Sequence, residues 1–481
     1  MSLLGLPSDI FLEVASRLDL LDAYSLSITC RFIRDLSQAQ AAYWANVLTS
    51  TRRMLPLPPY ENIRLLSIST VWKIALHMVV LQNNLDKEQP VLKQPVIQHD
   101  LAGQIRNHHN LTIIPGTPLI LLGLKNIERL SCFDYLRGQT LCSTDFTGHL
   151  HEVSAPMHQY RKSTVVVQIA TNIMDENPSL YVWTVEYSVT DQDIWSAKMT
   201  FSRIPKVRMD PMAGLPLYAI CTDAEIVAYT IPMNHGNPGK LKVVAHELHT
   251  GTTTTIITDM AIGMDVNDYI LTLKDRELFI IREDNDFTCI WTIPFSFLPY
   301  PGNPTEIEAN YTCASNPYYH RYETEADPSY LSLFANTTTR AHFDNSILSD
   351  LQATLISNDA VSGDDALFRY RRWTLPDAQQ QYQVSDTVPF NVERPDACDG
   401  PRSLSSVSSL LYTSSSGRKR RKVRELMLGR FQEGRLSHHR LQKPDGLDLH
   451  DVANLVFDEG LGVALVLLCD ETLVVLRYGM A

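Results

Sequence analysis

The sequence has no CxxC pair, no apolar run of membrane-spanning length and only one short basic run. Its eight cysteines are scattered over 481 residues, several of them inside apolar runs, where a thiol behaves as a small hydrophobic side chain. Such usage is typical of a reducing compartment. No run approaches the roughly 20 apolar residues that a membrane helix needs, and charged residues interrupt the N-terminal apolar stretch. We therefore expect no membrane association and an intracellular location, cytoplasmic or nuclear.

Positive charge is scarce, because the formal net charge is -12. Binding to a phosphate backbone requires clustered Lys and Arg, so this balance disfavours nucleic acid as the main ligand. The single concentrated basic run extends from Arg418 to Arg424. It is typical either of a nuclear import signal or of the exposed turn of a hairpin, and the sequence leaves both interpretations open.

Motifs of enzyme chemistry are also missing: the sequence contains no GxSxG, HExxH, Walker or GxGxxG motif. His246 and His249 are three residues apart, whereas a zinc-protease helix needs histidines at i and i+4. On a strand, an odd offset sends the two rings to opposite faces. We expect no catalytic residue, no metal and no cofactor. A set of acidic residues gathered from separate repeats would leave no spacing signature.

The N-terminal stretch from residue 4 to 36 has the pattern of short amphipathic helices. Pro7 suits the first turn of a helix, and Ile10, Val14 and Leu18 recur four residues apart on one face. Asp19 and Asp22 are both candidates for the cap of a second helix. The pattern predicts about three short helices within the first 45 residues or so, too few to bury a core alone. The segment therefore needs a partner.

The spaced motifs of this stretch resemble an F-box. They are Leu6-Pro7-x-Asp9-Ile10, Leu18-x-x-x-Asp22, Leu26-x-x-x-Cys30-Arg31 and a final Trp44. The resemblance implies that residues 1–50 dock on the small adaptor subunit of SCF-type cullin-RING ubiquitin ligases, and through it on the cullin. By the same resemblance, the adaptor-binding residues are Pro7, Ile10, Phe11, Val14, Leu26 and Cys30. Periodicity alone also allows these residues to pack on the chain's own body.

Residues 51–89 form a predicted connector and linking helix. Three prolines in residues 53–63 cannot continue a helix and indicate a semi-rigid boundary. Thr70 can cap a following helix. Its apolar positions are Val71, Ile74, Ala75, Met78 and Val79.

From residue 90 to 481 the pattern changes to short apolar runs, as expected for an all-β body. Seven pairs of such runs flank a turn, and each pair predicts a β-hairpin. The predicted turns lie at Asn126, Asp175, Asp223, Asp275, Asp364, Gly417 and Asp470. Five of the six intervals are close to the 40 to 50 residue period of propeller blades. We expect a β-propeller-like body of about seven blades. The alternative is a β-sandwich with a smaller β domain.

The long interval, between Asp275 and Asp364, contains a Pro-, Asn- and Tyr-rich segment at residues 299–330, interpreted as an insertion. Its tyrosines are candidates for contacting a target protein, although a tolerated surface loop explains the composition equally well. Together with the F-box resemblance, the body predicts a non-catalytic substrate receptor of a ubiquitin ligase, with an unknown protein target. The alternatives are a propeller hydrolase or lyase and an interaction scaffold that works outside a ligase.

Overall fold

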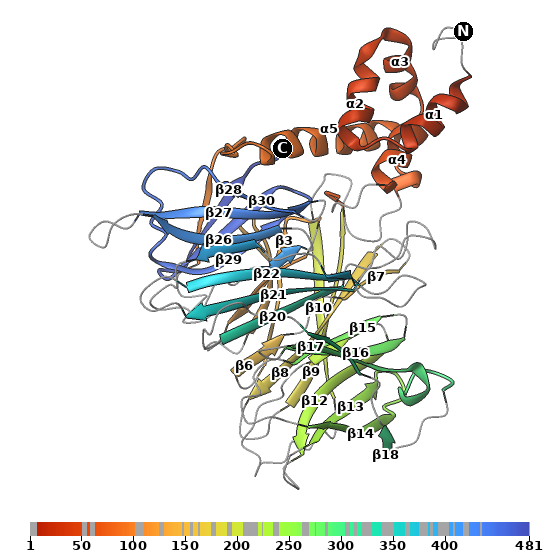
Figure 1. Cartoon of the computed structure of the whole chain (residues 1–481), viewed down its shortest axis with the longest axis vertical. Helices are drawn as coiled ribbons and strands as arrows, with labels where there is room; N and C mark the ends of the chain where they lie inside the picture. Colours follow the sequence, from red (N-terminus) through yellow and green to blue (C-terminus); the bar gives the residue numbers. More distant parts are fainter. Residues whose placement is uncertain are drawn as a thin grey trace.

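The computed structural model of the chain has an N-terminal helical domain, a long linking helix and a body of β-strands (Figure 1). The structure describes residues 7–50, 55–57, 63–101, 110–114, 116–124, 129–146, 149–153, 157–161, 164–174, 179–189, 195–204, 220–223, 225–233, 240–261, 269–274, 276–283, 287–303, 308–311, 315–319, 330–337, 351–360, 366–374, 383–384, 388–392, 404–406, 409–416, 423–432 and 435–480.

The helical domain consists of α1 (Ser8–Ser16), α2 (Leu20–Thr29), α3 (Arg31–Ala39) and α4 (Ala41–Ser50). Pro7 precedes α1, and the Asp19 side chain caps α2 by accepting a 2.8 Å hydrogen bond from the Asp22 amide. The prediction of three helices was wrong by one. Gln40 takes an extended conformation, which ends α3 and lets a fourth helix begin.

This fourth helix fills the centre of the helical domain. Trp44 and Tyr43 are fully buried, and the Tyr43 hydroxyl donates a 2.8 Å hydrogen bond to the carbonyl of Ala23 in α2. The Trp44 ring packs edge-on against Trp72, with the two ring centroids 5.2 Å apart. Trp72 belongs to the linking helix, so the core of the domain includes that helix.

The linking helix α5 (Ile68–Leu85) follows a short 3-10 turn, η2 (Ile63–Leu65). Its cap is Ser67 rather than the predicted Thr70: the Ser67 hydroxyl accepts a 3.2 Å hydrogen bond from the Thr70 amide. Thr70 is three residues inside the helix because Ile68 and Ser69 already have helical geometry. The predicted apolar positions, from Val71 to Val79, are buried.

The strands of the body form seven sheets in the described residues. Sheet 1 has β2 (Asn110–Ile113), β3 (Leu119–Leu124), β4 (Arg129–Asp134) and β5 (Gln139–Asp145). Sheet 2 has β6 (His149–Val153), β7 (Met157–Arg161), β8 (Thr164–Met174), β9 (Ser179–Val189) and β10 (Trp195–Arg203). Sheet 3 has β11 (Ile220–Thr222), β12 (Ile226–Met233), β13 (Lys240–Glu247), β14 (Thr253–Ala261) and β18 (Glu308–Tyr311).

Sheet 4 has β15 (Tyr269–Lys274), β16 (Glu277–Glu283), β17 (Phe287–Ile293) and β19 (Ser315–Tyr319), with the 3-10 turn η3 (Phe295–Phe297) after β17. Sheet 5 has β20 (Tyr330–Thr337), β21 (Leu351–Ala360), β22 (Ala366–Thr374), β23 (Gln383–Val384) and β24 (Val388–Val392). Sheet 6 has β25 (Leu404–Ser406), β26 (Ser409–Ser416), β27 (Val423–Gln432) and β28 (Arg435–Arg440). Sheet 7 has β1 (Ile97–Asp100), β29 (Val452–Asp458), β30 (Val463–Leu468) and β31 (Thr472–Arg477).

The strand pairs of all seven predicted hairpins are confirmed, and each pair lies in a different sheet. They are β3–β4, β8–β9, β11–β12, β15–β16, β21–β22, β26–β27 and β30–β31, each pair antiparallel. Of the predicted turn residues, Asp223 and Asp470 are described, whereas Asn126, Asp175, Asp275, Asp364 and Gly417 lie outside the described residues. The two-sheet sandwich considered as an alternative does not match a body divided into seven small sheets.

Neighbouring sheets pack on one another in chain order. Shared apolar clusters join sheet 1 to sheet 2, sheet 2 to sheet 3, sheet 3 to sheet 4 and sheet 6 to sheet 7. Strand β15 of sheet 4 contacts β20 of sheet 5, and β24 of sheet 5 contacts β26 of sheet 6. A further cluster joins sheet 7 back to sheet 1, through residues such as Leu465 and Leu122. The order of contacts is therefore circular.

Strand β1 completes sheet 7 by pairing antiparallel with β31, from Ile97 opposite Val475 to Asp100 opposite Thr472. The segment at 299–330 also supplies strands. Within it, β18 pairs parallel with β14 of sheet 3, and β19 pairs antiparallel with β17 of sheet 4. Residues 304–307, 312–314 and 320–329 of this segment lie outside the described residues, as do the side chains of β19.

Candidate functional site

The outer face of α1 presents apolar side chains to solvent. Ile10 and Val14, one turn apart, are 43% and 42% exposed, and Pro7 before them is exposed as well. Beside them on the same helix, Arg17 forms a 2.7 Å ion pair with Glu13, and both side chains are largely exposed. An isolated pair of this kind contributes little to stability. The helix therefore combines an unburied apolar stripe with a charged edge.

Two further apolar side chains are exposed on the neighbouring helices. Ile28, near the end of α2, is 52% exposed, and Phe32, in the first turn of α3, is 44% exposed. The ring of Phe32 packs edge-on against Phe11, with a centroid separation of 5.7 Å, so the start of α3 lies beside α1. We call Ile10, Val14, Ile28 and Phe32 the exposed apolar set.

The structure divides the six residues expected to bind the adaptor. Pro7, Ile10 and Val14 are exposed, whereas Leu26 and Cys30 are half-buried against the helical core. Phe11 is only 2% exposed, because it lies about a quarter turn away from the stripe, on the face of α1 that Ala15 also buries. In this conformation Phe11 supports the core and presents no surface. Apolar spacing could not separate the two faces of so short a helix.

Sequence reasoning missed Ile28 and Phe32. Ile28 and Phe32 are not among the residues that the spaced motifs of the F-box resemblance specify: Ile28 lies two residues before Cys30, and Phe32 directly follows Arg31. The available signal was the strongly amphipathic sequence of α3, whose buried face carries Ile33 and Ser37 and leaves Phe32 on the outside.

The C-terminal half of α5 joins the helical domain to the body. Leu81 and Leu85 belong to an apolar cluster with sheets 6 and 7. Asn84, 1% exposed, donates hydrogen bonds of 2.7 Å to the Val91 carbonyl and 2.9 Å to the Tyr478 carbonyl, and it accepts one of 3.1 Å from the Val91 amide. Figure 1 shows the C-terminus beside α5, with α1 to α4 gathered at the far end of the helix.

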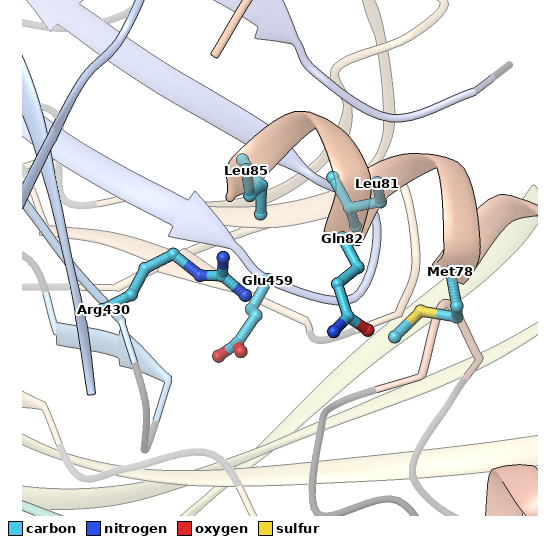
Figure 2. A pocket seen from close by; sticks show the side chains of 6 residues that line it. All are labelled: Met78, Leu81, Gln82, Leu85, Arg430 and Glu459. Carbon is cyan, nitrogen blue, oxygen red and sulfur yellow. The ribbon is translucent and has the colours of Figure 1, made fainter. Parts of the chain in front are cut away.

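A small cavity lies beside this junction. Figure 2 shows Met78, Leu81, Gln82 and Leu85 of α5 facing Arg430 and Glu459 of the body. Arg430, only 2% exposed, forms an ion pair with Asp86 at the end of α5. A buried guanidinium is strongly destabilising without an ionic partner, so Arg430 needs Asp86. The ion pair therefore holds the end of α5 against sheet 6.

The proline-rich connector also touches the body. A Cβ on Gly116 would overlap the backbone of Leu57, and a Cβ on Gly460 would overlap the carbonyl of Leu55. These glycines allow the connector to lie directly against sheets 1 and 7. Near them, His77 of α5 donates a 3.0 Å hydrogen bond from Nε2 to the Gly460 carbonyl, and burial lowers the pKa of His77. The connector and α5 are thus anchored at the same turn.

Comparison with known families assigns the helical domain. The F-box domain model matches residues 3–43. Residues 3–43 are an F-box domain. The F-box accordingly covers α1, α2, α3 and the first residues of α4, and the exposed apolar set lies wholly within it. A search of curated proteins finds no match to the chain.

Solved structures resemble the whole chain only distantly. One is a chain of the crystal structure of the mitotic checkpoint complex: 11% identity, a TM-score of 0.37, and coverage of 82% of this chain and 93% of that one. Another is the β-propeller domain of Cps50 (Swd1) from Myceliophteria thermophila: 9% identity, a TM-score of 0.27, and coverage of 76% and 82%. Both TM-scores are below 0.5, so the architecture of the body rests on its own sheets.

Outside the F-box, the remaining sequence candidates do not form a site in the described residues. His246 is buried in β13 with its Nδ1 2.7 Å from the Thr253 hydroxyl, whereas His249 is exposed in the following turn. No group of three potential metal ligands occurs among the residues that the structure describes. None of the described helices has the length and apolar character needed to cross a membrane.

The basic run at 418–422 lies outside the described residues, but Arg424 at its end is described. Arg424 is buried, 8% exposed, and its Nη1 donates hydrogen bonds of 3.2 Å to the carbonyls of Leu449 and His450. Its guanidinium therefore links sheet 6 to the segment before sheet 7, and it does not extend a surface patch.

Proposed function

We propose that the chain is a substrate-receptor subunit of an SCF-type ubiquitin ligase. The observation that supports this is the F-box at residues 3–43 with an apolar set left exposed by its own fold. F-box domains bind the small adaptor subunit of these ligases and through it the cullin. In this role the chain carries out no reaction itself: it holds a target protein near the ubiquitin-charged enzyme, which raises the effective concentration of the two.

In the proposed complex, Ile10 and Val14 of α1 and Ile28 and Phe32 of the next two helices contact the adaptor. These four side chains are each more than two-fifths exposed. Burying them against the adaptor would remove apolar surface from water, which contributes favourable free energy to binding. Pro7, Leu26 and Cys30 lie at the border of the contact. The buried ring of Phe11 packs edge-on against the ring of Phe32 and holds it in place.

The body is proposed to be a β-propeller with seven blades. Seven sheets of four or five strands, each containing one of the predicted hairpins and each contacting the next in a circular order, support this architecture. The pairing of β1 with β31 joins the N-terminal end of the body to the last sheet, which removes an open edge. Such a body offers a loop-rich rim for a target protein, and the segment at 299–330 is a candidate part of that rim.

Titration of the purified chain with the purified adaptor subunit tests the docking proposal. The wild-type chain should form a stable complex, and Ile10→Asp together with Val14→Asp should weaken it at least tenfold, because two charges would be buried without partners. Leu65→Asp is the matched control, because Leu65 is 83% exposed but lies in η2, outside the F-box. The affinity of this variant for the adaptor should equal that of the wild-type chain. The double change Pro7→Ala, Ile10→Asp should weaken binding in the same direction. Failure of the wild-type chain to bind would overturn the proposal.

A further inference from the structure

Two cysteines lie opposite each other in sheet 1. Cys132 in β4 and Cys142 in β5 are direct partners in the antiparallel register, and both are free thiols. Directly opposed residues in antiparallel strands have Cα atoms about 4.5 to 5.5 Å apart, and they point to the same face of the sheet. Disulfides span Cα separations of roughly 4.4 to 6.8 Å. The register therefore places the two residues at a Cα separation that a disulfide can span.

The two thiols differ in access. Cys132 is fully buried in the cluster that joins sheets 1 and 2, whereas Cys142 is only half-buried at the border of that cluster, on an outer strand, between half-buried Leu141 and exposed Ser143. The register shifts by one residue between Cys132 and Phe133, and the extra residue on β5 is Leu141. A bulge of this kind leaves Leu141 unpaired and disrupts the ladder next to Cys142.

The environment also separates the roles of the two sulfurs. The Cys132 thiol hydrogen-bonds to the Cys142 sulfur, and the Cys132 backbone amide donates to the same atom, so the pKa of Cys142 is lowered. The hydrogen bond to Cys142, together with burial, raises the pKa of Cys132. Cys142 is thus the more accessible thiol, and Cys132 is the protected one beside it.

We propose that Cys132 and Cys142 form a reversible disulfide modification site that reacts with a low-molecular-mass disulfide of the glutathione class. The Cys142 thiolate attacks one sulfur of oxidised glutathione, forming a mixed disulfide and releasing one glutathione thiolate. Cys132 then loses its proton and attacks the Cys142 sulfur, which breaks the bond to glutathione and releases the second glutathione. Two protein thiols are oxidised and one glutathione disulfide is reduced to two thiols.

The disulfide would join β5, the outer strand of sheet 1, to its neighbour β4. This link would lie next to sheet 2. Strand β5 contacts β10, and Cys132 and Trp183 share one apolar cluster, so the site lies on the seam between the two sheets. In a reducing compartment the pair remains a dithiol, and it becomes oxidised when the ratio of oxidised to reduced glutathione rises.

Peptide mapping of the full chain tests this directly, because Arg137 lies between the two cysteines. After treatment with oxidised glutathione, alkylation of remaining thiols and non-reducing trypsin digestion, the peptide that starts at Leu130 should appear linked to the peptide that starts at Gly138. Reduction should separate them. Recovery of both cysteines as alkylated thiols, or of Cys142 as a stable glutathione adduct in the wild-type chain, would overturn the proposal.

Variants separate the two steps. In Cys132→Ala the resolving thiol is missing, so the glutathione adduct should persist on Cys142. In Cys142→Ser neither the adduct nor the linked peptides should form. Cys469→Ser is the control, because Cys469 is an exposed thiol in another sheet, and the linkage between Cys132 and Cys142 should be unchanged. The wild-type peptide map keeps the test decisive if a variant at the buried Cys132 fails to fold.

Discussion

The carboxylate of Asp458, at the end of β29, accepts a 3.1 Å hydrogen bond from the backbone amide of Gly116, between β2 and β3. The same side chain accepts a 2.9 Å hydrogen bond from the Leu461 amide. One fully buried acid therefore joins the last sheet of the body to the first, at the turn where the connector and α5 are also held. The stability of this seam should follow the protonation of Asp458.

Burial raises the pKa of Asp458 from an ordinary 3.8 to about 6. The folded state then binds this proton more tightly than the unfolded state, so the group's contribution to stability is full below about pH 4 and is lost as pH rises to about 6. A shift of about two units corresponds to roughly 3 kcal/mol. We expect the free energy of unfolding of the wild-type chain, minus that of Asp458→Asn, to fall by up to that amount between pH 4 and pH 7. Urea unfolding at several pH values measures it, and parallel pH profiles would contradict the assignment.

Gly116 and Gly251 allow a comparison of two glycines that both have positive φ, +71° and +75°. Any other residue at such a φ is strained by about 1–2 kcal/mol. At Gly251 a Cβ meets nothing within 4 Å, whereas at Gly116 it overlaps the Leu57 backbone. We expect Gly251→Ala to cost only the strain and Gly116→Ala to cost clearly more, because the connector must move away. Thermal unfolding of the two variants tests this, and equal losses would show that the connector yields freely.

Asn84 and Asn83 form a second matched pair on α5. Asn84 is buried and holds Val91 and Tyr478, whereas Asn83 is exposed on the other side of the helix. Asn84→Ala leaves buried carbonyl and amide groups without partners, a loss of about 2–4 kcal/mol. Asn83→Ala should be nearly neutral. Hydrogen exchange is the informative measurement: exchange in the last turns of α5 should accelerate for Asn84→Ala and remain at the wild-type rate for Asn83→Ala.

Phe11 and Phe32 touch each other but should differ in function. Phe11 is 2% exposed, so Phe11→Ala should destabilise the F-box by about 3–5 kcal/mol, as for other buried aromatic residues. Phe32 is 44% exposed, so Phe32→Asp should leave the folded chain nearly intact and weaken adaptor binding. Circular dichroism and calorimetric titration of both variants separate the effects. Unimpaired adaptor binding by Phe32→Asp would remove this residue from the proposed contact.

Much of the fold could be predicted because its signals are local. Each hairpin joins two apolar runs through a short turn, so the seven pairings needed no long-range information. The start of α1 and the cap at Asp19 are also local. The fourth helix was missed because α4 is apolar around most of its circumference, which reflects its central position and leaves no amphipathic stripe to recognise.

The site was harder to predict because exposure depends on tertiary packing. In a helix as short as α1, Phe11 and Ile10 are neighbours in sequence, and only the positions of α3 and α4 decide which of them is buried. Strand β1 of sheet 7 was not identifiable either: its partner, β31, is distant along the chain, and four residues carry too little pattern. The anchoring of α5 likewise depends on Tyr478, which is 394 residues from Asn84.

That separation has a consequence for synthesis on the ribosome. The F-box precedes Asn84 in the chain and its helices can form early, whereas Asn84 gains its Tyr478 partner only when translation has proceeded 394 residues further. Strand β1 waits equally long for β31. During synthesis, the F-box therefore precedes the contacts that support its linking helix. A product that ends before residue 472 would carry the F-box on a helix without its Tyr478 contact, next to a sheet 7 that lacks β31.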